Sequence, residues 1–167
     1  MLSGTESLGK SSNQNGWLGS GIYFGVGSKE RAQEWAEQKH ARGLLKKAAV
    51  VGALIYPSHC LNLLDFGVLD EVKDAYNFLL DVFSKTGEVP PRNRCELNGI
   101  LVNRHLDCAV MNSVHQLRKE AGLTAYDTVL GAFEEGAPLF DGSAFRVKTH
   151  LQIAVRNHSC ILKYFLP

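Results

Sequence analysis

The segment at residues 16–25, GWLGSGIYFG, presents two aromatic side chains, Tyr23 and Phe24, between closely spaced glycines. Glycine has no Cβ, so such a segment lets another backbone or a flat ligand approach closely. In an extended segment the two rings point to opposite faces, so that one packs in the core and the other faces a cleft. An aromatic floor of this kind suits a planar heterocycle such as nicotinamide, whereas a buried glycine-rich hairpin is the commoner use of the pattern.

Histidine and cysteine offer the next candidate chemistry. The chain holds six histidines and four cysteines, with neighbouring donors such as His59 with Cys60 and His105 with Cys108. Zinc sites use closely spaced ligand pairs that recur, and no pair recurs here, so we expect no metal site. Cys108 and His115 share one face of a predicted helix, but about 10 Å of helical rise separates them. This spacing favours core packing over a nucleophile and its base.

Neither glycine-rich segment matches a known phosphate cradle. GSGIYFG and GVGS lack the Lys and Ser or Thr of a Walker A loop and the spacing of the dinucleotide fingerprint. Three arginines, Arg92, Arg94 and Arg104, raise the further option of an RNA-binding or RNA-modifying enzyme. No aromatic residues are interleaved with them, as single-stranded nucleic-acid sites require, so this option has little support.

Composition predicts one compact domain. The chain has 167 residues, of which 45% are hydrophobic, and a formal net charge of +1. A net charge this small creates no strong electrostatic potential that would attract a polyanion or an anionic membrane surface. The cysteines are scattered and no secretory segment or long apolar run is found, so we expect a reduced, cytoplasmic protein without a membrane partner. Residues 1–15 are polar and predict a flexible arm, and residues 16–167 predict the domain.

Hydrophobic periodicity predicts three helices and five strand segments beside the glycine-rich stretch. The helices are expected at 29–42, 68–87 and 101–121, an exposed loop at 88–99, and the strands at 48–56, 60–65, 125–133, 148–155 and 160–167. Ser28 is the expected cap of the first helix and Gly87 the stop of the second. Strands at both ends of the chain with helices between them predict an α+β fold with antiparallel pairing.

Four short motifs, taken together and in order, resemble ADP-ribosyltransferases of the poly(ADP-ribose) polymerase type. Residues 17–36 resemble that family's G-x-G-I-Y-F segment with the S-K helix that follows it. Residues 125–138 are similar to its D-S-V-x-G-x-G-x-x-x-P turn, and residues 149–167 resemble its last two strands. The chain is also similar to uncharacterised bacterial and phage-associated proteins with F-x-E-G and K-T-H-x-Q-I pieces. The match covers the first 36 residues and about the last 43, and leaves out the helical middle.

The resemblance implies an ADP-ribosyltransferase-like fold of two packed, mainly antiparallel sheets with flanking helices, and NAD as substrate without a metal. It assigns Tyr23 to stack on the nicotinamide ring, with the small residues Ser20 and Gly21 admitting that ring. The second aromatic residue of the family's site lies in the following helix. Trp35 is the nearest candidate for it, one position later than the family's tyrosine.

The family's catalytic glutamate lies on the penultimate strand, where this chain is best matched by Gln152. Gln152 and His150 share one face of the expected strand, so both can face the cleft. An amide lacks the charge that stabilises a developing cation, so the resemblance implies transfer of a single ADP-ribose. Glu135, or Glu134 beside it, is a candidate for the missing acceptor or base, and a solvated turn is the alternative for both.

A departure from the family lies at the amino end. Where its members carry H-G-T or H-G-S, this chain offers only Ser3-Gly4-Thr5, eighteen residues before Tyr23. Either the first strand is missing or the match at Ser3 is accidental.

Two hypotheses about function follow from the resemblance and this departure. The first is a mono-ADP-ribosyltransferase-like domain acting on an unknown acceptor, protein or nucleic acid. The second is a degenerate member that binds NAD, ADP-ribose or a protein partner without turnover.

Overall fold

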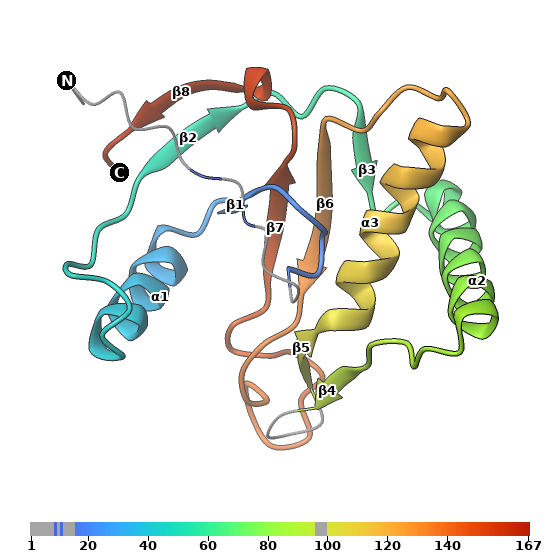
Figure 1. Ribbon diagram of the computed structural model, residues 1–167. Helices are drawn as coiled ribbons and strands as arrows, with labels where there is room; N and C mark the ends of the chain where they lie inside the picture. Colours follow the sequence, from blue (N-terminus) through green and yellow to red (C-terminus); the bar gives the residue numbers. More distant parts are fainter. Residues whose placement is uncertain (1–8, 10, 12–15, 96–99) are drawn as a thin grey trace.

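A computed structural model describes residues 9, 11, 16–95 and 100–167 of the chain (Figure 1). Among these residues the chain forms a mixed α+β structure, as its sequence predicts. The helices are α1 (Lys29–Ala41), α2 (Leu69–Thr86) and α3 (His105–Glu120), with short 3-10 turns at Phe66–Val68 and His158–Cys160. The strands are β1 (Ile22–Gly25), β2 (Gly52–Ile55), β3 (Cys60–Asn62), β4 (Asn93–Cys95), β5 (Leu101–Arg104), β6 (Thr128–Phe133), β7 (His150–Val155) and β8 (Ile161–Phe165).

The central sheet has four strands in the order β1-β7-β6-β3. Strand β7 pairs antiparallel with both β1 and β6, whereas β3 pairs parallel with β6. Two antiparallel ribbons, β2-β8 and β4-β5, complete the strands of the described residues. In Figure 1, α2 and α3 stand on one side of the central sheet, α1 lies on the other, and β4-β5 lies at one end. The fold is therefore antiparallel in most pairs, but its strands form one small sheet and two ribbons instead of two sheets.

Local signals explain the first two helices. Helix α1 begins directly after Ser28, as expected, although the serine side chain makes no capping hydrogen bond. Helix α2 carries Asp70 and Glu71 in its first turn, where the helix dipole favours negative charge. It ends at Gly87, which has a φ of 72°, a left-handed conformation that glycine adopts without strain. Both helices lie where the periodicity predicts them.

Several boundaries differ from the prediction: the strands expected at 48–56, 60–65 and 125–133 are shorter, as β2, β3 and β6, and two differences concern the middle of the chain. The exposed loop expected at 88–99 contains β4, and the helix expected from residue 101 begins only at His105, because β5 takes the residues before it. Asn93 of β4 explains the helix start. Its side-chain oxygen accepts a hydrogen bond from the first-turn N–H of Leu106 at 2.9 Å, which satisfies a donor that the helix itself leaves free. Since this cap comes from a distant strand, the helical period does not reveal it.

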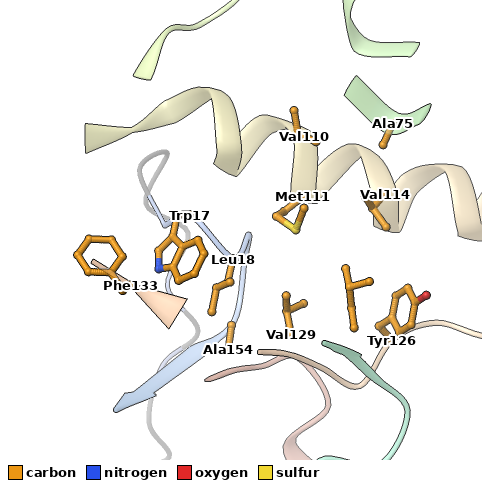
Figure 2. Close-up of a cluster of buried hydrophobic side chains, with 11 residues drawn as sticks. Trp17, Leu18, Ala75, Val110, Met111, Val114, Tyr126, Val129, Phe133 and Ala154 are labelled. Atoms are coloured by element: carbon orange, nitrogen blue, oxygen red, sulfur yellow. The ribbon is translucent and has the colours of Figure 1, made fainter. Parts of the chain in front are cut away.

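The main core lies between the central sheet and helices α2 and α3 (Figure 2). Trp17 and Phe133 lie side by side at one end of this cluster, and Tyr126 lies at the other end. Its buried members are Trp17, Leu18, Leu61, Ala75, Val110, Met111, Val114, Tyr126, Val129, Phe133 and Ala154. A second buried cluster of Ile22, Val155 and Cys160 packs on the opposite side of β1.

The rings of Tyr23 and Phe24 point to opposite faces, as the extended segment predicts. Tyr23 packs against the main core and Phe24 against the second cluster. Both side chains are half-buried, so each ring packs partly against protein and keeps part of its surface exposed. The expectation that one of them faces a cleft stays a prediction.

Most of the arm expected at residues 1–15, including Ser3-Gly4-Thr5, lies outside the described residues. Within it, Ser11 forms an isolated antiparallel bridge with Gly21, and the Ser11 N–H donates to the Gly21 carbonyl at 2.8 Å. Among the described helices, none has the length and apolar character needed to cross a membrane.

Candidate functional site

Polar and aromatic side chains meet on the face of the central sheet that is turned toward α3. Phe133 of β6 lies opposite His150 of β7 in the strand register. Gly131 lies opposite Gln152 in the same pairing. Directly paired residues in an antiparallel sheet share a face, so these four positions are neighbours. The indole of Trp17 covers Gly131 so closely that a Cβ at this position would overlap the ring.

A chain of hydrogen bonds fixes Gln152 and His150. The indole Nε1–H of Trp17 donates to the Gln152 Oε1 at 2.8 Å, and the Gln152 Nε2 lies 2.8 Å from the His150 Nε2. An amide nitrogen only donates, so the histidine Nε2 accepts and the ring is neutral with its proton on Nδ1. That Nδ1–H donates to the Lys148 carbonyl at 2.7 Å. The amide of Gln152 is therefore oriented with its oxygen toward the indole.

A half-buried guanidinium, that of Arg104, covers the two aromatic rings beside Gln152. The Arg104 Cζ lies 4.9 Å from the Trp17 ring centroid and 4.5 Å from that of Phe133. The two centroids are 5.6 Å apart, with 48° between the ring planes. Only 16% of the Arg104 side chain is exposed, and its Nη1 is 4.0 Å from the Asp107 carboxylate. Burial lowers the pKa of Arg104, and the carboxylates of Asp107 and Glu134 oppose this effect.

Arg104 also lines an open depression with a volume of about 350 Å³. The other polar residues of its wall are Asn93, Asp107, Glu134 and Arg146. The side chain of Arg104 thus separates this depression from the rings of Trp17 and Phe133. Small-molecule sites commonly begin at about this size.

A second depression, of about 470 Å³, is lined by residues 89–94 and His105. It contains Arg92 and Arg94, two of the three arginines that raised the RNA-binding option. Both lie in the exposed part of the β4-β5 region, whereas Arg104 is turned inward against aromatic rings. The three arginines therefore do not form one surface.

Tyr23 holds the turn that carries Trp17. Its hydroxyl donates to the Gly19 carbonyl at 2.7 Å and accepts from the Leu18 N–H at 3.0 Å. Burial raises the pKa of Tyr23 above its ordinary value, which keeps the hydroxyl protonated and able to donate. Tyr23 lies opposite Ala154 on β7, on the same face of the sheet as Gln152.

The small residues beside Tyr23 accommodate protein atoms. The Ser20 carbonyl and Oγ both accept from the Arg156 Nη1, at 3.0 and 2.9 Å. A Cβ at Gly21 would lie 3.1 Å from the Val155 carbonyl oxygen, which is tighter than most real Cβ contacts. Of the two uses that the sequence left open for these glycines, Gly21 serves the close approach of another backbone.

Trp35 and Glu135 lie in other surroundings. Trp35 is 51% exposed on α1, and the Lys39 ammonium lies 3.8 Å from its ring centroid. The Glu135 carboxylate accepts from the Arg31 Nη2 at 2.5 Å, which ties the segment after β6 to α1. A second ion pair, between Lys148 and Glu34, joins the same two parts of the chain. The structure thus brings His150 and Gln152 together, with Tyr23 nearby, and pairs Glu135 with a cation on α1.

The nucleophile candidate Cys108 and its expected partner His115 have the character of core residues, whereas the metal candidate His59 is exposed. Cys108 is buried, and burial raises the pKa of its thiol. Burial, together with the charges of Arg156 and Arg118, lowers the pKa of His115 to about 3. A neutral imidazole and a protonated thiol agree with core packing. In the described part of the chain, no three His, Cys, Asp or Glu side chains are grouped to hold a metal ion.

Sequence reasoning missed Trp17 and Phe133, and it named Arg104 only as part of an RNA-binding option together with Arg92 and Arg94. Trp17 directly precedes the Leu-Gly-Ser-Gly segment, and the alternation of Gly131 with Phe133 places both on one face of a strand. Those two signals were present in the sequence. The contact of Arg104 with the two rings had no signal in the sequence, because the periodicity placed this residue inside a helix and its contacts depend on the β4-β5 ribbon.

No protein-family model matches the chain, and searches of curated proteins and of solved structures found no match. What the fold and site define is a mixed α+β domain with a polar and aromatic cluster on the α3 side of its central sheet.

Proposed function

We propose that the chain is an NAD-dependent mono-ADP-ribosyltransferase-like domain that transfers ADP-ribose to an unknown acceptor, protein or nucleic acid, with release of nicotinamide. The pairing of β1 with β7 is the observation that supports this proposal. It joins the G-I-Y-F segment to the strand that carries Gln152, with Gly25 opposite Gln152 and Tyr23 opposite Ala154. The two motifs on which the resemblance depends come from opposite ends of the chain and become neighbours.

In this reaction the bond between the ribose C1′ and the nicotinamide nitrogen breaks. Nicotinamide leaves with the bonding electrons, and an acceptor lone pair forms the new bond to C1′ while the acceptor proton passes to a base. Gln152 has the role of a hydrogen-bond partner for the ribose, and its neutral amide stabilises the cationic ribose less than a carboxylate. Glu135 serves as base only once Arg31 releases it. Glu134, which lines the depression, is the alternative base.

A second candidate function is binding of NAD or ADP-ribose without turnover. It is favoured by the hydrogen bond from Trp17 to the Gln152 oxygen, because that bond occupies one of the two lone pairs through which this oxygen could accept from the ribose. In this candidate the cluster holds the nucleotide but supplies no group that promotes loss of nicotinamide.

One experiment separates the two candidates. The protein is incubated with adenine-labelled NAD, free nicotinamide and labelled products are measured, and NAD binding is measured by calorimetry. We expect Gln152→Ala to lower nicotinamide release by about tenfold or more, while Gln33→Ala, an exposed glutamine of α1, leaves it unchanged.

Binding of NAD by the wild type without nicotinamide release would instead establish the second candidate. Absence of both binding and release in the wild type would contradict both candidates. Equal release by the wild type and Gln152→Ala would show that the site lies elsewhere.

A further inference from the structure

We propose that Trp17 and Phe133 form a binding site for a planar aromatic cation, and that the guanidinium of Arg104 occupies this site in the free protein. The identity of the cation rests on the proposed function: it is the pyridinium ring of a nicotinamide nucleotide. The site differs from the one implied by the family resemblance, which uses Tyr23 and Trp35.

Arg104 shows which kind of group the two rings accept. A guanidinium is flat and carries a delocalised positive charge, and here it contacts both ring faces, with its Cζ 4.9 and 4.5 Å from the centroids of Trp17 and Phe133. Both rings are buried, at 9% and 8% exposure. Attraction between a cation and an aromatic face is strongest where water is excluded. Two tilted, buried rings thus select a flat cation over a neutral ring of the same shape.

Two carboxylates favour a cation in the same place. The Asp107 carboxylate lies 4.0 Å from the Arg104 Nη1, and the charge of Glu134 also acts on this guanidinium. Both acidic groups also line the depression into which the arginine side chain moves, together with Arg146, so their charge acts on the displaced arginine as well as on the cation that replaces it. Arg104 is held by a long ion pair with Asp107, by a hydrogen bond from its Nε to the Leu101 carbonyl at 2.8 Å and by the two rings, and a ligand must replace these contacts. Its burial also lowers its pKa, a sign that desolvation penalises its charge.

The depression beside Arg104 gives the displaced side chain a place to go. Arg104 lines this space of about 350 Å³ on one side and covers the two rings on the other. Rotation of the arginine side chain into the depression joins the ring faces to an open site. Arg104 then acts as a built-in competitor, because ligand binds only the fraction of molecules in which the rings are uncovered.

This site is connected to Gln152 through Trp17. The indole that receives the cation on its face also donates its Nε1–H to the Gln152 oxygen. A pyridinium stacked on Trp17 therefore lies beside the amide to which the proposed function assigns the ribose. Displacement of Arg104 is the step that brings ligand and amide together.

Tryptophan fluorescence tests the proposal directly. The chain has two tryptophans, so Trp35→Phe leaves Trp17 as the single reporter. The probe is 1-methylnicotinamide, a cation, and neutral nicotinamide is its uncharged counterpart. We expect 1-methylnicotinamide to quench Trp17, and Arg104→Met to tighten its binding by about tenfold. We expect neutral nicotinamide to bind more weakly in every variant.

The matched control is Arg94→Met, which removes the same charge from the neighbouring strand β4 at an exposed position. It corrects for the general effect of one positive charge fewer. Arg104→Lys keeps the charge but loses the planar group. Its affinity for 1-methylnicotinamide should lie between those of the wild type and Arg104→Met, and it replaces the methionine variant in the test if that variant does not fold. Adding Phe133→Leu to Arg104→Met should abolish the gain in affinity.

Equal affinity of Arg104→Met and Arg94→Met for 1-methylnicotinamide would overturn the proposal. Neutral nicotinamide binding as tightly as the cation would also overturn it. These results are independent of the NAD assay. Tighter cation binding by Arg104→Met without NAD binding or release would support the cation site and contradict the proposed function. NAD turnover together with equal affinity of Arg104→Met and Arg94→Met for 1-methylnicotinamide would support the proposed function and contradict the cation site.

Discussion

Replacement of Tyr23 by phenylalanine removes one oxygen atom and, with it, two hydrogen bonds. The hydroxyl accepts from the Leu18 N–H at 3.0 Å and donates to the Gly19 carbonyl at 2.7 Å. Leu18 is fully buried, so its N–H loses its partner where water does not reach it. An unsatisfied buried donor costs about 1–3 kcal/mol, and the second hydrogen bond contributes about 1 kcal/mol more.

We therefore expect Tyr23→Phe to lower the free energy of unfolding by about 2–4 kcal/mol. For a domain of this length this corresponds to a fall in Tm of roughly 5–15 °C. Urea unfolding at neutral pH measures the change. Tyr56→Phe is the matched control, because Tyr56 is 64% exposed and its replacement should stay within about 0.5 kcal/mol.

The same variant tests whether Tyr23 positions Trp17. In a Trp35→Phe background, Trp17 emission should shift to longer wavelength when Tyr23→Phe loosens the turn. Burial raises the pKa of Tyr23 above its ordinary value, so wild-type stability should be intact below about pH 10 and fall above it. The pKa values of Tyr126 and Cys108 are also raised, so Tyr23→Phe should show a smaller alkaline loss than the wild type. A Tyr23→Phe protein as stable as Tyr56→Phe, with unchanged Trp17 emission, would refute the reasoning.

Two further predictions concern the core. Gly131→Ala places a Cβ against the Trp17 indole and should cost about 1–3 kcal/mol of stability by urea unfolding, with a red shift of Trp17 emission. Gly25→Ala on β1, where a Cβ would make only an ordinary contact with the Ser28 carbonyl oxygen at 3.9 Å, is the control, and equal losses in the two variants would contradict the packing argument. For His115, the lowered pKa of about 3 means that its contribution to stability is full above about pH 6.5 and is lost as pH falls. Wild type should lose up to about 1.4 kcal/mol per pH unit more than His115→Leu between pH 6 and 4, and parallel pH profiles would show that His115 is not responsible.

The predictable elements are those whose signals lie within their own sequence. Helix α2 has an apolar period and a glycine in the left-handed conformation directly after its end, and both are local. The face shared by His150 and Gln152 follows from the two-residue period of a strand, and the hydrogen bond between these side chains confirms it. Strand alternation gives the face of a side chain but not its neighbour across the sheet.

The elements that sequence did not predict depend on distant partners. Helix α3 starts at His105 because Asn93, on another strand, supplies the capping oxygen. Trp17 lies over Gly131 because the register of β6 against β7 leaves a position without a side chain beside Gln152. Neither relation has a signature in a local window of the sequence. Both become visible only when the strand register is known.

Protein atoms already fill the space beside the glycines of this site. Gly21 admits the backbone of β7, and Gly131 admits the indole of Trp17. A ligand that reaches Gln152 must therefore replace interactions that exist, above all those of Arg104 with the aromatic rings. A neutral ring would lose both cation–π contacts without a substitute, whereas a pyridinium restores them and keeps the attraction of the nearby carboxylates. The charge of the ligand, more than its shape, should thus determine which planar molecules enter this domain.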